Sequence, residues 1–416
     1  MAPLSLAAHP LALFVASNAI FILTAARTSR ASPIRYVALG CLIVCAYLLP
    51  QSLQSFAQTT GWAGRVCAGA GLNTCLNFTD KLLIRGWDYE HYGSSATETA
   101  VSAGGQKGSR PLPAGKSPRS RDQFVSEVTG NVRGIGTFWQ VRNVPPFSLV
   151  QPAFVPSRVA FLFKQTFAVI ACYNLHNLAV RILFSLDFRY FETTHVPLFA
   201  TLGAATTTNL YSRIISTASY WTIQYAMIQF FYSLAGLLSA FTHPESIELW
   251  PPMFGSAVDA YTLRNFWGKS WHQSLRANLE SISEHTAHEI LRLPPKGALQ
   301  RYAKIFNSFA LSGLMHAVAD MGGGLPARRS GAMQFFLMQA LGIMIEDGVQ
   351  AVWTQMSSDL GSGSGRARVG RVVGYAWVAF YLVWTSPVWI YPACMSMREE
   401  DALLRMGAVR PLFSGR

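Results

Sequence analysis

Long apolar runs separated by polar connections constrain the fold of this chain more than any other feature. About 20 apolar residues are enough to cross the hydrocarbon core of a bilayer as one α-helix. Seven runs approach that length, at residues 10–26, 34–49, 159–184, 213–241, 305–321, 331–353 and 372–394. An eighth run, residues 62–84, is interrupted by Arg65, Asp80 and Lys81, so it spans the membrane, lies in its interface or re-enters it from one side.

The composition agrees with a membrane protein. Half of the 416 residues are hydrophobic and only 13% are charged, whereas about a quarter are charged in an ordinary soluble domain. The alternating pattern of a membrane β-barrel is not seen. We therefore expect an all-α fold, a polytopic integral membrane helical bundle with about seven or eight transmembrane helices.

The same pattern predicts how the chain is divided. Residues 93–121 are Ser, Gly, Thr, Ala, Pro and basic residues with almost no large apolar side chain, which is typical of a segment that cannot order itself. We expect N-terminal transmembrane segments over residues 1–92 and a flexible, partly disordered cytosolic loop over 93–157. A transmembrane core would follow at residues 158–396, and it would contain a cytosolic motif loop at residues 242–304. Residues 397–416 would form a short C-terminal tail.

Charge and cysteine content narrow the function classes. The net charge is +13, but the basic residues are dispersed among apolar runs, which argues against a nucleic-acid partner. Arg27, Arg30 and Arg35 lie in the first short connection, and the positive-inside bias places that connection in the cytosol and the N-terminus outside. None of the six cysteines has CxxC spacing, so neither a zinc site nor a disulfide framework is indicated.

One histidine stands out within the apolar run at residues 305–321. An imidazole at membrane depth is costly unless it faces a protein interior or a wet cavity, so His316 is a candidate functional residue. Ser312 and Asp320 lie four residues before and after it, which places all three on one helical stripe. Asp320 either orients the imidazole or marks the end of the helix before Gly322-Gly323-Gly324.

A second cluster lies in the motif loop, where three aromatic residues, a histidine and a lysine fall within the nine residues from Asn265 to Gln273. On a helix, Trp267 and Trp271 would share one face, with His272 beside the second ring. Such a segment is either an aromatic belt at the membrane surface or part of a functional site.

Three motifs in this order resemble a known family. Phe266-Trp267-Gly268-Lys269-Ser270-Trp271-His272-Gln273 is followed by Ser312-Gly313-Leu314-Met315-His316, and then by Phe335-Phe336-Leu337-Met338-Gln339 through Ile345-Glu346-Asp347. The pattern, over about residues 242–394, resembles the wax synthase-like branch of the membrane-bound O-acyltransferase (MBOAT) superfamily, and in particular its fungal secondary-metabolite acetyltransferases.

The resemblance implies an acyl-CoA-dependent O-acyltransferase of the endoplasmic reticulum membrane. The acyl group, expected to be acetyl from acetyl-CoA, would pass to a hydroxyl of a lipophilic acceptor such as a terpenoid, with no bound cofactor. His316 matches the catalytic histidine of the family, and a histidine is suited to remove an alcohol proton because its ordinary pKa is about 6.5. His272 would assist. Supporting or substrate-binding roles fall to Trp267, Trp271, Asn265, Ser312, Asp320 and Glu346.

Alternatives to this function remain open from the sequence. One is transfer of a long fatty acyl chain to an alcohol or lipid, which would make wax or sterol esters. Another is a proton-coupled transporter in which His316, Asp320 and Glu346 relay protons. A metal centre is not expected, because His285-Thr-Ala-His288-Glu289 matches neither common zinc-protease motif. Of the adjacent Glu346 and Asp347, at least one is expected to face a cavity.

Overall fold

The computed structural model describes residues 9–56, 61–92, 120–137, 139–197, 207–357 and 364–395. Within these ranges the chain is helical and forms no β-strand, which confirms the all-α fold class. Most of the predicted loop at residues 93–121 lies outside the described residues.

Six helical segments of the described chain are long and apolar enough to cross a membrane. They are α1 (Pro10–Arg27), α2 (Ile34–Phe56), α6 (Arg158–Phe184), α8 (Thr207–Thr242), α12 (Ala332–Ser357), and the segment Arg368–Met395, which includes most of α13 (Ser364–Thr385) and all of α14 (Pro387–Met395). Six of the seven clear runs in the sequence therefore correspond to spans.

The two remaining runs also form helices, but these are too polar to be among the six. Residues 62–84 fold as α3 (Gly61–Phe78) followed by the π-helix η2 (Thr79–Ile84), and residues 305–321 lie in α11 (Ala298–Gly322). In residues 62–84, Asn73 and Asn77 add to the polarity of the three charged residues. In residues 305–321, the polar side chains include Asn307, His316 and Asp320. The predicted number of seven or eight spans is therefore higher than the six described helical segments that are both long enough and apolar enough to cross a membrane.

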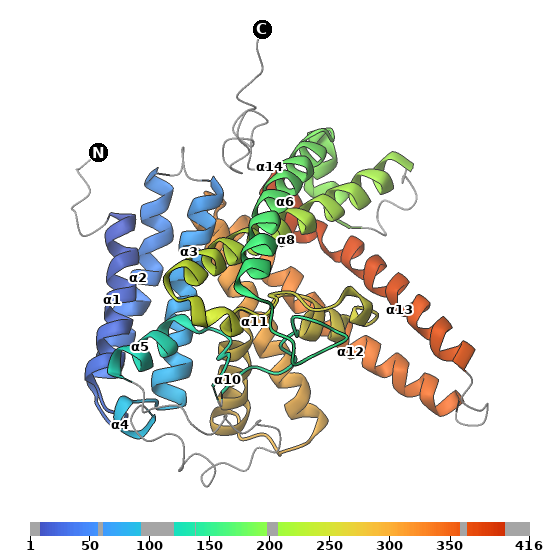
Figure 1. The fold of residues 1–416 in the computed structure, drawn as a ribbon. Helices are drawn as coiled ribbons and strands as arrows, with labels where there is room; N and C mark the ends of the chain where they lie inside the picture. Colours follow the sequence, from blue (N-terminus) through green and yellow to red (C-terminus); the bar gives the residue numbers. More distant parts are fainter. Residues whose placement is uncertain are drawn as a thin grey trace. The chain divides into compact units, whose positions relative to one another are not determined.

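The chain folds as two compact units, each built from two separate stretches of sequence. The first unit consists of Met1–Arg142 and Gln273–Gly324, and its helices α1, α2 and α3 lie side by side (Figure 1). Its other elements are α4 (Tyr89–Tyr92), α5 (Arg121–Gly130), α10 (Arg276–His285), the π-helix η8 (Thr286–Ile290) and α11.

Helix α5 shows how local sequence and burial act together in the first unit. Ser120 accepts a hydrogen bond from the backbone N–H of Gln123, whose side chain accepts one from the Ser120 N–H, so two N–H groups at the helix start are satisfied. The helix then buries Phe124 and Val128 in a core that includes Phe78. Part of the predicted cytosolic loop is thus an ordered helix.

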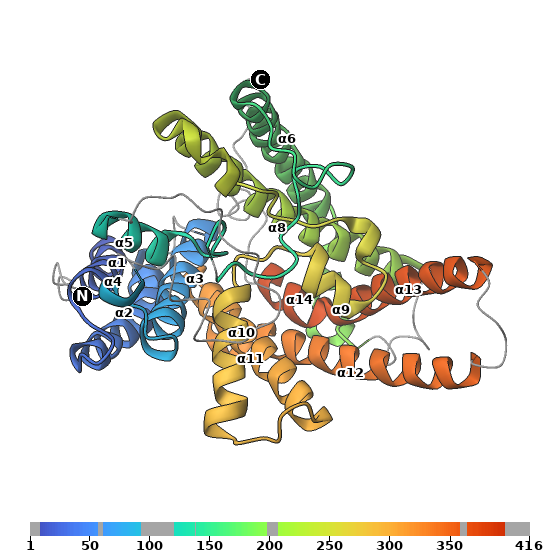
Figure 2. The same ribbon diagram turned by 60° about the horizontal axis from the view of Figure 1, so that its bottom comes forward.

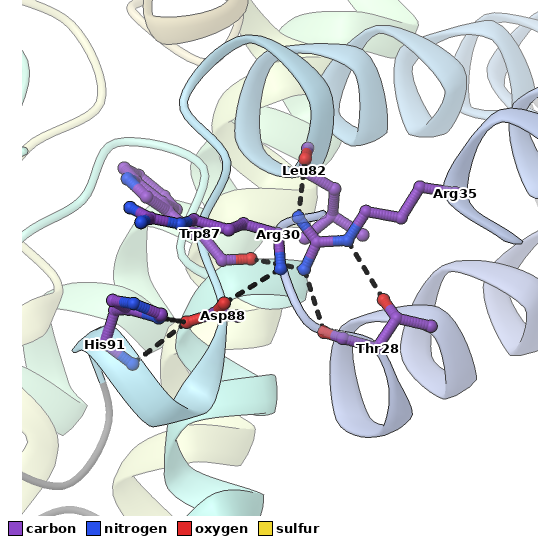
Figure 3. A network of polar contacts seen from close by, with 7 residues as sticks. All are labelled: Thr28, Arg30, Arg35, Leu82, Trp87, Asp88 and His91. Carbon is purple, nitrogen blue, oxygen red and sulfur yellow. Dashed lines mark hydrogen bonds and ion pairs between the residues drawn. The ribbon is translucent and has the colours of Figure 1, made fainter. Parts of the chain in front are cut away.

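A buried arginine holds the first connection of the same unit together (Figure 3). The Arg35 side chain is 1% exposed and donates hydrogen bonds to the Thr28 hydroxyl and to the carbonyls of Thr28, Leu82 and Trp87. A buried guanidinium needs such partners, because an unsatisfied buried charge is strongly destabilising. Arg35, first interpreted as an orientation signal, therefore also ties α2 to the segment after η2.

The second unit consists of Asn143–His272 and Leu325–Arg416. Its helix α6 packs along α8, and α12 and α13 run alongside each other (Figures 1 and 2). Short helices complete it, namely η3 (Phe188–Phe191), η4 (Thr193–His195), η5 (Pro244–Leu249), η6 (Ala257–Asp259), α9 (Leu263–Asn265), the π-helix η7 (Phe266–Ser270) and η9 (Ala327–Arg329).

Candidate active site

His316 lies in the last two turns of α11, in the first unit. Its side chain is half-buried, whereas Ser312 and Asp320 on the same stripe are buried. The helical spacing predicted from the sequence is therefore correct. A half-buried imidazole flanked by two buried polar groups differs from an ordinary apolar helix face, where side chains without polar atoms would be expected.

The carboxylate of Asp320 is held by α3. Arg65 donates from Nη1 to Asp320 Oδ1 at 2.8 Å, and the two side chains are 17% and 2% exposed. Asp320 also lies in the final turn, because the N–H of Gly323 bonds to the carbonyls of Ala319 and Asp320 just after the helix ends. Asp320 thus marks the helix end and, in addition, joins α11 to α3.

Small residues let the two helices approach closely at this point. A Cβ at Gly322 would overlap the carbonyl of Gly64 and the side chain of Ala68, and Gly69 faces Ala319 in ordinary contact. Helix backbones separated only by such residues are restricted in rotation and sliding, since any larger side chain would force them apart. The position of α11 relative to α3 is therefore tightly defined.

The aromatic motif begins at two short helices of the second unit. The Thr262 hydroxyl accepts the N–H of Asn265 at the start of α9, and η7 continues as one π-turn closed by the Trp271 N–H on the Phe266 carbonyl at 2.7 Å. The chain then becomes extended at Trp271. A second stretch holds this turn, because Gly255 N–H donates to the Ser270 carbonyl and the Ser270 hydroxyl donates to the Ser256 carbonyl.

The tryptophans of the motif pack into their own unit. The Trp271 ring lies 5.0 Å from that of Trp221 on α8 and 5.3 Å from that of Phe254, and the Trp267 ring contacts Phe336 on α12 at 5.9 Å. Both half-buried rings therefore pack against other elements of their unit and do not simply project from a surface helix. They contact each other at 6.3 Å, although the regular helix ends at Ser270.

A polar group lies within these aromatic contacts. Gln339 on α12 is fully buried, accepts from the Trp267 indole N–H at 3.4 Å, and donates to the Thr385 hydroxyl on α13 at 3.0 Å. A buried amide with partners on two elements fixes their register, because breaking either bond leaves a desolvated polar atom.

His272 follows these rings directly. Its imidazole lies 5.6 Å from the Trp271 ring and 6.0 Å from the Phe254 ring. Burial among such groups disfavours the charged form and lowers the pKa of His272 to about 4. His272 is therefore neutral near pH 7, and a neutral imidazole has one N–H to donate and one nitrogen to accept.

The adjacent carboxylates Glu346 and Asp347 both bind α9, just before the motif. Glu346 Oε2 accepts the backbone N–H of Leu263 at 2.7 Å, and Asp347 binds Arg264 through a pair of contacts. Both carboxylates thus hold α9, and neither contact shows the predicted exposure to a cavity.

The predicted residues fall into two groups. Ser312, His316 and Asp320 belong to the first unit, whereas Asn265, Trp267, Trp271, His272 and Glu346 belong to the second. In the amino-acid sequence Arg65 only interrupts an apolar run, and Gln339 is one residue of a motif with no sign of its partners. Trp221 carries no sequence signal at all, because it is one aromatic residue within an apolar run.

Of the two histidines considered for a metal site, His285 and His288, the second takes part in an ion-pair cluster. His288 Nε2 lies 2.8 Å from Glu284 Oε1, and Lys304 binds the other oxygen of that carboxylate at 2.7 Å. Across the described part of the chain, no group of three or more His, Cys, Asp or Glu side chains is placed to hold a metal ion.

Comparison with known proteins adds to this geometry. Residues 250–338, which include His272 and His316, match the model of the membrane bound O-acyl transferase family. The chain is 37% identical over 275 residues to acetyltransferase fsoF of Humicola fuscoatra, covering 64% of this chain and 65% of that protein. It is 35% identical to acetyltransferase spyB of Aspergillus fumigatus, over 68% and 49% of the two chains.

A third relative matches along most of its length. Acetyltransferase aurG of Calcarisporium arbuscula is 28% identical over 388 residues, which is 91% of this chain and 90% of that protein. By contrast, the matches to the first two relatives span less than two thirds of the length of each. The similarity thus extends well beyond the three motifs.

Proposed function

Because this chain belongs to the membrane bound O-acyl transferase family, we propose that it transfers an acyl group from acyl-CoA to a hydroxyl group of a lipophilic acceptor. The six apolar helices and the family make it an integral membrane protein. The proposal is carried by one observation: the family match, residues 250–338, contains both His272 and His316, and each lies in a polar or aromatic setting that a plain span does not need.

The proposed reaction begins with His316 as general base. The neutral imidazole takes the proton of the acceptor hydroxyl while the oxygen attacks the thioester carbonyl, so a C–O bond forms and a tetrahedral oxyanion develops. Its collapse breaks the C–S bond. The thiolate of coenzyme A leaves and takes up the proton from His316, which balances the reaction and returns the base to its neutral form.

His272 has a different proposed task. A group that stays neutral near pH 7 is a weak general acid, but its N–H can donate a hydrogen bond to an oxygen that gains charge. We assign it the carbonyl oxygen of the thioester. The aromatic rings of Trp271 and Phe254 exclude water from the imidazole, and a hydrogen bond in such a setting is stronger than one in water.

Acetyl is the proposed acyl group. The relatives that support it are named acetyltransferases, and they come from fungi. The proposed acceptor is a terpenoid-like secondary metabolite that enters from the bilayer, with acyl-CoA entering from the cytosol and the enzyme in the endoplasmic reticulum. A long-chain acyltransferase is the runner-up, whereas the family match does not favour a proton-coupled transporter.

The test measures ester formation in microsomes that contain the parent protein, His316→Ala or His272→Ala. Each is incubated with labelled acetyl-CoA or labelled palmitoyl-CoA and a panel of lipophilic alcohols. We expect ester only from acetyl-CoA, a loss of at least about 100-fold in His316→Ala, and a smaller loss in His272→Ala. His243→Ala is the matched control, because His243 is an exposed histidine beyond the end of α8.

Two results would contradict the proposal separately. Ester formed equally by the parent and by His316→Ala removes the assigned base. Ester formed from palmitoyl-CoA but not from acetyl-CoA would support acyltransferase activity but contradict acetyl-CoA as the acyl donor.

A further inference from the structure

Arg65 is the one charged residue of α3, and its largely buried position costs free energy of solvation. A guanidinium that is 17% exposed has lost most of its hydration, yet among the described residues only Nη1 has a partner, Asp320, while Nε and Nη2 are buried without one. Such incompletely satisfied charge is costly. A residue kept for packing alone would serve better as an apolar side chain.

The contact is aimed at the helix that carries His316. Asp320 follows His316 by four residues, so the two lie about 6 Å apart along the axis of α11 and on the same stripe. The guanidinium stem of Arg65 lies against Gly323, where any Cβ would overlap it. Arg65 is thus clamped between the end of α11 and the small residues of α3.

We propose that Arg65 is a positioning residue for His316: by binding Asp320 it holds the catalytic end of α11 against α3 and cancels the one carboxylate charge on the stripe of the histidine. The proposal rests on the function proposed above. It assigns a role to a residue that lies far outside the family match at residues 250–338.

Other charged groups on the neighbouring elements have different partners. On α10, Arg276 binds Glu280 at 2.7 Å, and Glu284 binds Lys304 of α11 and His288 of η8. The single charged residue of α2, Arg35, binds hydroxyl and carbonyl oxygens near the start of that helix. Apart from His316, the remaining charged or titratable groups on α1, α2, α3, α10, η8 and α11 are Arg27, Tyr36, Cys41, Cys45, Tyr47, Cys67, Cys75, His285, Glu289, Arg301 and Tyr302. The contacts described for these neighbouring groups do not involve Arg65 or Asp320, so replacing Arg65 or Asp320 leaves those contacts in place.

The experiment uses the pH dependence of acetyl transfer, because a general base is active only in its unprotonated form and the rate therefore falls at acidic pH. Asp320→Asn leaves the Arg65 cation uncompensated one turn from His316. An arginine cannot lose its proton, so it disfavours the imidazolium, and the acidic limb of the kcat profile should move to lower pH by about one unit. The double variant Arg65→Met/Asp320→Asn removes both charges, and its limb should return to that of the parent.

A second readout separates positioning from substrate binding. Asp320→Asn should lower kcat by about tenfold and change KM for acetyl-CoA by less than about threefold, because a displaced base costs rate and not donor affinity. Each variant is first extracted in detergent, and its folded fraction is measured by size exclusion. If Asp320→Asn does not accumulate, Arg65→Met is measured instead, and its limb should move to higher pH.

The outcomes distinguish the two proposals. An acidic limb that does not move in the folded single variant overturns the role of Arg65, whatever the loss of rate. Full activity in His316→Ala overturns the proposed function instead. A limb that moves in the single variant and returns in the double variant supports the assignment, because a purely structural contact would not give shifts that depend on charge.

Discussion

Glu346 on α12 accepts the backbone N–H of Leu263 at 2.7 Å, and Leu263 begins the short helix α9 that leads into the aromatic motif. A carboxylate at a helix start satisfies an N–H that has no partner within the helix. Next to it, Asp347 binds Arg264, so two consecutive carboxylates hold the first two residues of α9, just before the motif. The approach of the chain to His272 is therefore determined from α12.

Replacement of Glu346 should loosen this attachment. In Glu346→Ala the buried N–H of Leu263 loses its acceptor, so we expect a loss of about 1–3 kcal/mol in stability and a reduced rate of acetyl transfer. Glu346→Gln keeps an oxygen that can accept the same N–H and should retain most of the stability. Thermal unfolding in detergent compares the two. Equal midpoints for the alanine variant and the parent would show that the bond is not needed.

Gly255 should be sensitive to a single added methyl group. A Cβ at this position would overlap the carbonyl of Lys269, which belongs to the turn before Trp271 and His272. We expect Gly255→Ala to displace that turn and to reduce ester formation by at least about tenfold, as misplacement of catalytic groups does. Gly348→Ala on α12 is the control, because nothing lies within contact distance of its added Cβ. Similar activity of both variants would contradict the prediction.

The burial of His272 predicts how stability depends on pH. The pKa of His272 is about 4 in the folded protein and close to 6.5 in the unfolded chain, so below pH 6.5 only the unfolded state takes up the proton. The contribution of His272 is therefore complete above pH 6.5 and is lost as the pH falls towards 4, by about 2–3 kcal/mol. Unfolding midpoints at pH 7 and pH 4.5 should differ less in His272→Gln than in the parent. An identical difference in both would show that His272 titrates normally.

Variants of Arg35 and Arg30 can distinguish a structural role of Arg35 from a role in membrane orientation. Arg35→Met removes four hydrogen bonds from a buried position and should destabilise the protein by about 3 kcal/mol or more, because the freed carbonyls stay buried. Arg30→Met removes a similar charge from the same connection, yet it keeps the Arg30 backbone N–H that donates to Asp88. Expression and unfolding of the two variants are compared. If both lose the same amount, the charge and not the hydrogen-bond network matters.

Much of the fold could be predicted from the amino-acid sequence. Apolar length and helical spacing are local properties, so they located α1, α2, α6, α8 and α12 and the stripe of Ser312, His316 and Asp320. The order of the motifs pointed to the family that the comparison then matched at residues 250–338. Apolarity alone was less reliable where polar residues interrupt a run, as at Arg65.

The partners of the polar residues were decided only by the tertiary structure. Arg65 and Asp320 are 255 positions apart, and Leu263 and Glu346 are 83 positions apart. A pattern along the chain cannot show such pairs, because whether a buried charge is paired depends on which helices pack together and on how closely their small residues let them approach. The sequence thus determined the helices and the two histidine motifs, whereas packing between distant segments determined what holds each histidine in place.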